Sequence, residues 1–415
     1  MSNHPWNRRD FIVKPVAGLA ASNLLGGFNQ LLGQEPAKGP SGTETISRTL
    51  GRTGIRLPIV SFGVMNADVP GLVRRAYELG MRLFDTAAFY QQGRNEQMVG
   101  NMIREMGVRD KATISTKILR PDFGRPGSEA QARTYTPAEV KAHFLEVFAA
   151  SQKRLQMDHV DILYNHACDT EAQINSEGAI EALTQLKKEG KTRFIGVSSH
   201  SPELALKLAA KSGVYDVVLI TFNYTMAQDE GLRKAIDEAA KSGIGIVAMK
   251  TQSGGMMGPN PNRARNLPPE SQTAMLKWVL QHESITTAIP GCTRYEHLEQ
   301  NLTVASNLAL TPAERNFLGD RKTVAEAQFC RQCGECRGDC PFGVDIPTLM
   351  RSHMYAVQYS NLQLASDTLV SFTRGRGLNA CNDCENCKAN CRNSVDIAMK
   401  IRHLKNLSAG GALTV

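Results

Sequence analysis

Eight of the ten cysteines in this chain form two copies of one spacing pattern near its C-terminal end. In each copy two residues separate the first three cysteines, and three residues separate the third from the fourth. The two sets are Cys330, Cys333, Cys336 and Cys340, and then Cys381, Cys384, Cys387 and Cys391. Thiolates with this spacing bind [4Fe-4S] clusters, so two copies predict two clusters and an electron-transfer module.

The pattern is part of an internal duplication, because each set is followed at the same distance by Val-Asp-Ile, starting at Val344 and at Val395. In two-cluster proteins with this run, the fourth cysteine of each set binds the other cluster. The expected ligands of one cluster are therefore Cys330, Cys333, Cys336 and Cys391. Those of the other are Cys381, Cys384, Cys387 and Cys340.

Zinc and disulfides are the alternative uses of these thiols. Zinc takes four ligands, usually from two separated pairs, which leaves the third cysteine of each set without a role. Disulfide frameworks are typical of short secreted chains, whereas this chain has 415 residues. Iron-sulfur clusters account for all eight cysteines.

The segment between the two sets, from Ile346 to Ser371, has the periodicity of one or two amphipathic helices. Such a helical insert resembles alpha-helical ferredoxins more than compact clostridial ones. The sequence therefore predicts a mostly α-helical iron-sulfur domain over 320–410.

The middle of the chain alternates short β-prone runs with helical patterns. The runs are Ile59–Val64, Leu83–Ala87, Ala112–Lys117, Val160–Asn165, Phe194–Ser198, Val217–Phe222, Gly245–Met249 and Thr287–Pro290. Eight strand-helix units over ~250 residues predict an α/β fold, a (β/α)8 TIM barrel, over 46–310. Chemistry in such a barrel is carried by the residues where strands end.

Three successive strand ends carry chemically capable side chains. Asp85 lies near the end of the second run and Tyr90 follows that run, Lys117 ends the third, and His166 follows the fourth. These residue types at these strand ends resemble the catalytic tetrad of the aldo-keto reductase superfamily. The resemblance covers roughly Ile46 to Leu308 and includes Asn95-Glu96 in the loop after the tyrosine.

The resemblance implies a role for each tetrad residue in reducing a carbonyl. Tyr90 would donate the proton, and because a free phenol has a pKa near ~10, Lys117 is expected to lower that value. Asp85 would hold Lys117, and His166 would orient and polarise the carbonyl. Taken singly, each residue has an ordinary structural alternative, such as a surface charge or a hydrogen-bonded histidine.

The resemblance also implies residues that bind NADP(H) or NAD(H). They are Ser198, Ser199, Asn223, Gly254, Gly291, Arg294 and Asn301. The match is weaker here, since Ser199 replaces a common Asn and Met249-Lys250-Thr251 replaces a common stacking aromatic. Arg294 favours NADPH, although His297 stands where relatives often have Arg. Cys168 and Cys292 are expected to be small buried thiols.

The first forty residues resemble a twin-arginine export signal, with Arg8 and Arg9 before Phe11 and a weakly apolar stretch from Val16 to Phe28. This favours a periplasmic protein and places an export signal and linker over 1–40. No Ala-x-Ala site precedes Gln34, so a cytoplasmic protein with a disordered N-terminus is the alternative.

The net charge of +8 is spread along the chain without a run of five basic residues, and aromatic residues make up only 6%. Nucleic-acid binding is therefore not expected. We expect an oxidoreductase that acts on a small carbonyl compound or alcohol and exchanges electrons with a separate partner. The alternatives are a nicotinamide-independent dehydrogenase that passes electrons through the clusters, and a non-catalytic redox-sensing or binding module.

Overall fold

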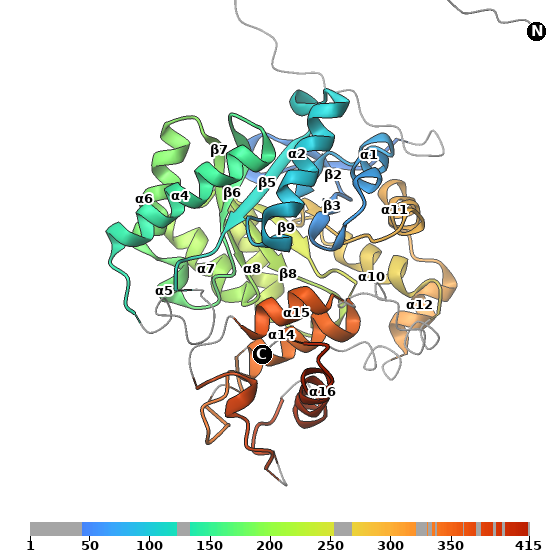
Figure 1. Cartoon of the computed structure of the whole chain (residues 1–415). Coiled ribbons are helices and arrows are strands. Elements are labelled where there is room, and N and C mark those ends of the chain that lie inside the picture. The colour runs from blue at the N-terminus through green and yellow to red at the C-terminus, as the bar shows by residue number, and fades with distance from the viewer. Residues whose placement is uncertain are drawn as a thin grey trace, which may run out of the picture. The chain divides into compact units, whose positions relative to one another are not determined.

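The computed structural model describes most of the chain after residue 43 (Figure 1). The described residues are 44–122, 133–252, 268–320, 330, 334–336, 338–359, 361–370, 375–384, 387–391 and 395–413. They belong to one compact unit, Pro36–Val415. The expected export signal lies outside the described residues.

Eight parallel strands form the sheet of the barrel. They are β3 (Phe62–Gly63), β4 (Leu83–Asp85), β5 (Thr113–Ile118), β6 (Val160–Asn165), β7 (Thr192–Ser199), β8 (Val217–Thr221), β9 (Gly245–Met249) and β10 (Thr287–Ala288). The order in the sheet follows the sequence, and bridges from Val60 to Ala288 and from Gly63 to Gly291 join its two edges. The predicted (β/α)8 barrel is confirmed, with a strand at each predicted position.

Helices cover the outside of the sheet (Figure 1). They include α1 (Pro70–Glu78), α2 (Arg94–Met106), α4 (Pro137–Leu155), α5 (Glu171–Ile174), α6 (Glu177–Lys188), α7 (Pro202–Ser212), α8 (Glu230–Lys241), α10 (Ser271–Leu280), α11 (Tyr295–Leu302) and α12 (Pro312–Gly319). Their starts follow from local sequence: proline occupies the first turn of α1, α4 and α7. Thr136 and Glu139 form a capping box at α4.

The barrel interior is filled by large side chains, among them Tyr164, Leu219 and Val247. The antiparallel hairpin of β1 (Ser47–Thr49) and β2 (Arg56–Pro58) lies against the amino-terminal side of β9. There Gly51 adopts φ +48°, and a Cβ at this position would lie 2.3 Å from the backbone nitrogen of Gly245. The hairpin thus occupies the end of the barrel opposite to the strand ends that carry the chemistry.

The C-terminal part of the chain is mostly helical, as predicted. It contains α14 (Ile346–His353), the π-helical turn η7 (Met354–Gln358), α15 (Leu362–Leu369) and α16 (Ile397–Ala409). The two Val-Asp-Ile repeats start α14 and α16, because Asp345 and Asp396 accept hydrogen bonds from the third backbone N–H of each helix. The duplication therefore places a capped helix after each cysteine set.

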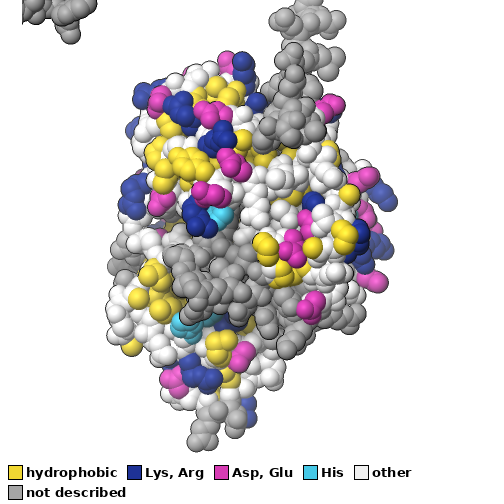
Figure 2. Space-filling model, turned by 90° about the vertical axis from the view of Figure 1, so that its right-hand side faces the viewer, with side chains coloured by type: hydrophobic (Ala, Val, Ile, Leu, Met, Phe, Trp, Pro, Cys, Tyr) yellow, Lys and Arg dark blue, Asp and Glu magenta, His cyan; other side chains and the backbone are white. Residues whose placement is uncertain are grey.

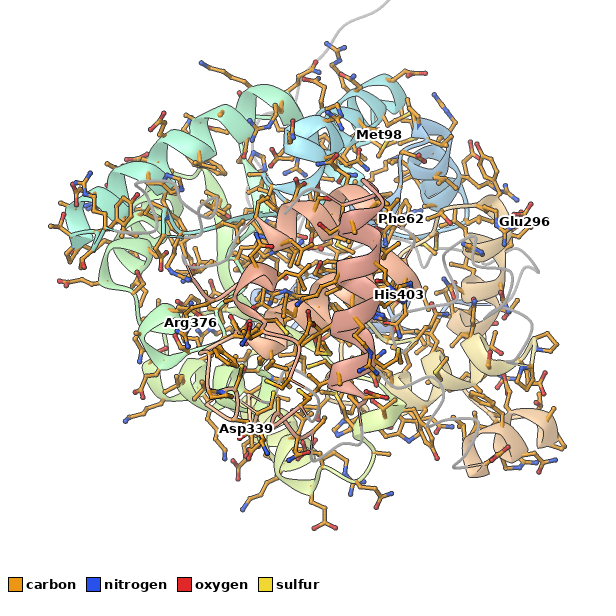
Figure 3. All side chains as sticks on the ribbon, turned by 60° about the horizontal axis from the view of Figure 1, so that its bottom comes forward. Phe62, Met98, Glu296, Asp339, Arg376 and His403 are labelled. Carbon is orange, nitrogen blue, oxygen red and sulfur yellow. The ribbon has the colours of Figure 1, made fainter. Side chains whose placement is uncertain are left out.

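The loops that carry the two cysteine sets are joined to each other. The backbone N–H of Asn390 donates to Asp339 at 3.1 Å, and the backbone N–H of Asp345 donates to the carbonyl of Arg376 at 2.9 Å. Figure 3 shows Asp339 and Arg376 in these loops and His403 on the helix beside them. His403 meets His353 at 3.3 Å and so links α16 to α14.

No helix in the described part of the chain is long and apolar enough to cross a membrane. On the face seen in Figure 2, Lys and Arg side chains are interspersed with Asp and Glu. This distribution agrees with the spread of charge along the sequence.

Candidate active site

The four tetrad residues meet at the carboxyl ends of neighbouring strands and line one cavity. The Lys117 Nζ lies 2.5 Å from Asp85 Oδ2 and 3.3 Å from the Tyr90 hydroxyl. It also donates to the carbonyl of Thr86 at 2.6 Å. The rings of Tyr90 and His166 meet edge to face with centroids 5.8 Å apart. The sequence prediction that these four side chains come together agrees with the geometry.

Hydrogen bonds of Asn95 and Glu96 stabilise the loop that carries Tyr90. Asn95 accepts a hydrogen bond from Thr86 at 2.6 Å and donates to the carbonyl of Val64 at 2.8 Å. Glu96 is fully buried and accepts from Thr116. After Tyr90, the residues at 91 and 92 adopt positive φ values of 49° and 56°. A strained backbone persists where its surroundings fix it, which is common beside active sites.

Burial shifts the pKa values of three side chains in the site, Tyr90, Lys117 and His166. Burial and then the negative charge of Asp85 raise the pKa of Tyr90 well above its ordinary value. Burial lowers the pKa of Lys117, and Asp85 opposes this shift. Burial and then the charge of Lys117 lower the pKa of His166 well below its ordinary value. The imidazole is therefore neutral, and the phenol is protonated near neutral pH.

The lowering of the Tyr90 pKa by Lys117 stays a prediction, because burial and Asp85 set the net direction here and raise this pKa. Loss of solvent and the carboxylate of Asp85 outweigh an ammonium that lies 3.3 Å away. Lys117 instead donates a hydrogen bond toward the phenol oxygen, which stabilises negative charge only when that charge develops.

The C-terminal helices form part of the cavity wall, which the sequence did not predict. Five residues from this region line the cavity: Arg351, Tyr355, Tyr359, Leu364 and Thr368. The π-helical turn η7 begins directly after α14 and carries Tyr355, and the rings of Tyr355 and Tyr359 stack with centroids 5.9 Å apart. The four-residue spacing of two tyrosines within a predicted helix is the signal that was available.

A salt bridge ties this wall to the barrel. Arg351 is buried, and its Nη1 lies 3.3 Å from Asp169 Oδ2 and 3.4 Å from His200 Nδ1. Asp169 in turn accepts from the backbone N–H of His200 at 2.7 Å. Burial and then the charge of Lys250 lower the pKa of His200 to about 4, so this imidazole is neutral.

Lys250 lies between the barrel and the C-terminal wall. It follows β9, adopts φ +55°, and its Nζ is 3.4 Å from the Tyr355 hydroxyl. Burial and then the charge of Arg351 lower the pKa of Lys250 to about 7, while Asp169 and Cys330 act in the opposite direction. A cysteine of the first set is thus within electrostatic reach of the cavity.

Only part of the predicted nicotinamide-binding set faces this cavity. Ser198 and Gly291 line it, and the Ser198 hydroxyl accepts from the backbone N–H of Ala167 at 3.0 Å. Ser199 instead donates to Asp169 at 3.2 Å. Asn223 starts the short helix η5 (Tyr224–Met226) by accepting from the backbone N–H of Thr225.

The other residues predicted to bind the nicotinamide nucleotide lie beside the cavity or outside the described residues. Asn301 is buried and accepts from Gln252 at 2.7 Å, and Gln252 itself lines the cavity. Arg294 lies 3.2 Å from His297. Gly254 lies outside the described residues. Sequence reasoning missed His200 and Gln252 as wall residues.

Two buried polar atoms in the cavity wall, His166 Nδ1 and Thr251 Oγ1, lack a hydrogen-bond partner among the described residues. Such atoms favour a polar ligand. The cavity measures about 100 Å³, below the ~300–1,000 Å³ of common ligand pockets. The side chains fit the reacting ends of a nicotinamide and a carbonyl compound, whereas this cavity alone does not hold a dinucleotide.

A second cavity fits one of the predicted clusters. Cys340, Cys381, Cys384 and Cys387 line a space of about 450 Å³. The fourth cysteine of the first set thus lies with the first three cysteines of the second set, which is the arrangement that the sequence predicted. Of the other set, Cys330, Cys336 and Cys391 pack in or against the apolar core of the C-terminal helices, and Cys333 lies outside the described residues.

Within the described residues, no three His, Cys, Asp or Glu side chains gather as the ligands of a single metal ion would. The donor set of cysteine thiols and the cavity that four of them share fit a [4Fe-4S] cluster. Both barrel thiols, Cys168 and Cys292, are buried as expected.

Two protein-family models match the chain in separate regions. The model of the aldo/keto reductase family matches residues 63–275. The model of a 4Fe-4S dicluster domain matches residues 329–396. Together the two models cover the barrel from β3 to α10 and both cysteine sets.

Curated relatives match the barrel. L-glyceraldehyde 3-phosphate reductase of Escherichia coli is 26% identical over 322 residues, which are 64% of this chain and 89% of that protein. L-galactose dehydrogenase of Arabidopsis thaliana is 26% identical over 313 residues, 67% of this chain and 94% of that protein. A solved aldo-keto reductase from Bacillus halodurans, in its holo form, superposes with a TM-score of 0.55 at 23% identity, covering 70% of this chain and all (100%) of that one. This structural likeness shows the barrel fold.

Proposed function

The chain belongs to the aldo/keto reductase family and carries a C-terminal 4Fe-4S dicluster domain, and from this premise we propose that it reduces a small carbonyl compound, or oxidises the alcohol, with NADP(H) or NAD(H). The observation that carries the proposal is the buried position of Lys117 between Asp85 and Tyr90. The names of the curated relatives, a reductase of an aldose phosphate and a dehydrogenase of a sugar, support a small-molecule substrate.

Tyr90 acts as the proton donor in this proposal. A nicotinamide, when bound, supplies the hydride to the carbonyl carbon. Negative charge then develops on the carbonyl oxygen, and the Tyr90 hydroxyl transfers its proton to that oxygen. The resulting phenolate is stabilised by Lys117, whose position is fixed by Asp85 at 2.5 Å.

His166 orients the substrate. Its imidazole is neutral, because burial and Lys117 lower its pKa, so it donates a hydrogen bond to the carbonyl without adding charge. Ser198, Ser199, Asn223, Gly254, Gly291, Arg294 and Asn301 are proposed to contact the nicotinamide nucleotide. Arg294 supports NADPH over NADH, since guanidinium groups bind phosphate well.

The eight cysteines would hold two [4Fe-4S] clusters, with Cys340 and Cys391 exchanged between the sets. These clusters supply one-electron transfer when bound. The cavity shared by Cys340, Cys381, Cys384 and Cys387 supports this arrangement. A separate redox partner would receive or supply the electrons. The proposed domains are an export signal and linker over 1–40, a barrel over 46–310 and an iron-sulfur domain over 320–410.

A second candidate is a dehydrogenase that passes substrate electrons through the clusters without a nicotinamide. Two observations favour it. Arg351 and Tyr355 of the C-terminal helices line the cavity, and the charge of Cys330 acts on the pKa of Lys250 in the cavity wall. A non-catalytic sensor has less support, because all four tetrad residues are present and in contact.

We also propose export to the periplasm by the twin-arginine route, with a cytoplasmic location as the alternative. Changing Arg8 and Arg9 to Lys should retain the protein in the cytoplasm if the signal operates. Cell fractionation measures this, and an unchanged distribution would favour the cytoplasmic alternative.

The decisive experiment is an anaerobic titration of the cluster-loaded protein with NADPH and with NADH. Nicotinamide fluorescence and cluster absorbance are followed together. Saturable binding without cluster bleaching supports the nicotinamide reductase. Binding with bleaching means that the two sites exchange electrons, and absence of binding favours the nicotinamide-independent dehydrogenase.

A further inference from the structure

The charges in the wall of the active-site cavity do not balance among the described residues. Lys117 is paired with Asp85 at 2.5 Å. Arg351 is paired with Asp169 at 3.3 Å. Lys250 is the remaining basic side chain in the wall, and no described carboxylate lies within 4.0 Å of its ammonium group.

The surroundings of Lys250 offer little compensation. Its nearest polar neighbour in the described structure is the neutral hydroxyl of Tyr355, at 3.4 Å, and its Nζ lies 5.1 Å from the centre of that ring. The residues that follow it in the sequence, 253–267, contain neither Asp nor Glu. A partly buried ammonium without a carboxylate is costly, and the cost is removed when a ligand brings the missing negative charge.

The two histidines of the wall leave this imbalance unchanged. Burial lowers the pKa of His166 well below its ordinary value and that of His200 to about 4, so both rings are neutral near pH 7. The paired groups and the neutral groups together leave Lys250 as the one basic side chain of the wall without a described carboxylate partner, and with a pKa lowered to about 7 it carries the excess positive charge in about half of the molecules near pH 7. This charge lines the same small cavity as Tyr90 and His166.

We propose that Lys250, assisted by Arg351 from the iron-sulfur domain, binds a carboxylate of the substrate, so that the substrate class is a short carbonyl acid or the corresponding hydroxy acid. The inference rests on the proposed function, because it assumes that the carbonyl reacts at Tyr90. A cavity of about 100 Å³ suits a compound in which the carboxylate and the carbonyl are close together. The guanidinium of Arg351 is held by Asp169 and raises the potential at the carboxylate site.

The backbone conformation of Lys250 agrees with this role. A lysine at φ +55° is in the left-handed region, which glycine occupies more readily. Lys250 follows directly after β9, and its side chain lines the cavity. Two other anions compete as explanations: the thiolate of Cys330 in a cluster and the pyrophosphate of a bound nucleotide.

The test compares acids with their neutral amides as substrates of the cluster-loaded full-length protein. Pyruvate, glyoxylate and succinic semialdehyde are each assayed against the corresponding amide, and kcat/KM is measured for wild type, Lys250→Met, Lys250→Arg and Lys207→Met. Lys207 lies on α7, its side chain is 58% exposed, and it serves as the control for loss of a lysine.

Wild type should prefer at least one acid over its amide. Lys250→Met should lower the ratio of the two kcat/KM values by about 30-fold, because a carboxylate would lose its buried ion pair. Lys250→Arg should retain most of the ratio, and Lys207→Met should leave it unchanged. Dissociation constants for the same acids, measured by calorimetry, should weaken in parallel in Lys250→Met.

Three results would overturn the inference. An equal ratio in wild type and Lys250→Met excludes a carboxylate site at Lys250. A parallel loss for acid and amide, with weaker NADPH binding, assigns Lys250 to the nucleotide. An unchanged ratio with a shifted cluster midpoint potential assigns it to the cluster. If wild type reduces neither acids, amides nor a simple aldehyde, the proposed function fails first, and this inference fails with it.

Discussion

The barrel and the cysteine-bearing loops hold their functional side chains in opposite ways. In the barrel, Lys117 is 1% exposed and Asp85 is 4% exposed, and protein atoms fix both. In the loops, Cys384 and Cys387 are exposed, and Cys381 and Cys391 are half-buried. The barrel therefore organises its site with its own hydrogen bonds, whereas the loops leave their thiols for a bound group to organise.

Helices α14 and α15 contact both the barrel cavity and the cysteine-bearing part of the chain. Helix α14 begins at the Val-Asp-Ile repeat that follows the first cysteine set, and it carries Arg351 into the barrel cavity. Ser352 of the same helix donates to the carbonyl of Ala365 at 2.9 Å and so joins α14 to α15. Helix α14 therefore connects the first cysteine set to a wall of the active site.

The largest expected effect concerns the barrel alone. Tyr90→Phe should lower kcat for carbonyl reduction by about 10³-fold, since general acid catalysis contributes roughly 10²–10⁴-fold. Its iron content should equal that of wild type, because the barrel does not hold the clusters. Steady-state kinetics and iron analysis of the same preparation measure both quantities.

Tyr215→Phe is the matched control for this substitution. Tyr215 is buried in the barrel, and its hydroxyl donates to the carbonyl of Ile174 at 2.5 Å, away from the cavity. It should keep a wild-type kcat. A Tyr90→Phe protein with wild-type kcat would remove the tyrosine from the chemistry and would support the sensor or the nicotinamide-independent enzyme.

The next effect concerns the loops alone. Cys387→Ser should reduce iron from about eight to about four atoms per chain, because one [4Fe-4S] cluster loses a ligand. Cys168→Ser, in which a buried barrel thiol is replaced, should retain all the iron. Anaerobic iron and sulfide analysis measures the difference, and equal iron in the two variants would contradict the two-cluster assignment.

The sequence predicted most of the features that depend on local pattern. Strand runs, caps and cysteine spacing are encoded within a few residues, so the barrel and the helices after Val344 and Val395 were foreseeable. The tetrad was predictable because each member lies at or shortly after the end of a strand, and parallel strands end at one face. The helical segment from Ile346 was also predicted, as α14, η7 and α15.

Features that depend on docking between regions were not predictable from one sequence. Asp169 and Arg351 are 182 residues apart, and no local pattern relates them. Burial raises the pKa of Tyr90, and this effect could not be predicted beside that of Lys117, because tertiary packing sets how deeply a loop residue is buried. Ser199 and Arg294 have protein partners, Asp169 and His297, that the sequence did not indicate.

The docking itself can be tested through Asp169. Asp169→Asn removes the charge opposite Arg351 and should lower the free energy of unfolding by about 3 kcal/mol, the cost of leaving a buried cation without its partner. Glu203→Gln, in the exposed pair with Lys207 at 2.6 Å, should change it by less than about 1 kcal/mol. Urea unfolding measures both, and hydrogen exchange of 346–358 should rise only in Asp169→Asn.

A further expected effect, which develops only as the pH is lowered, is a change in pH dependence at the same interface. The pKa of His200 is lowered to about 4 in the folded protein, from about 6.5 in an unfolded chain. Between these values the unfolded chain binds a proton that the folded protein excludes. The free energy of unfolding therefore falls as the pH decreases, by about 3 kcal/mol in total from this residue.

His200→Gln should lack this contribution and show a shallower loss of stability between pH 6.5 and 4, with no difference in slope above pH 6.5. Urea unfolding at intervals of one pH unit measures the two slopes. Acid also protonates the cluster thiolates, but it does so in both proteins, so the difference between them isolates His200. Parallel slopes would mean that His200 becomes protonated without cost, and that the contact between Arg351 and the barrel is open to water rather than packed as a wall of the cavity.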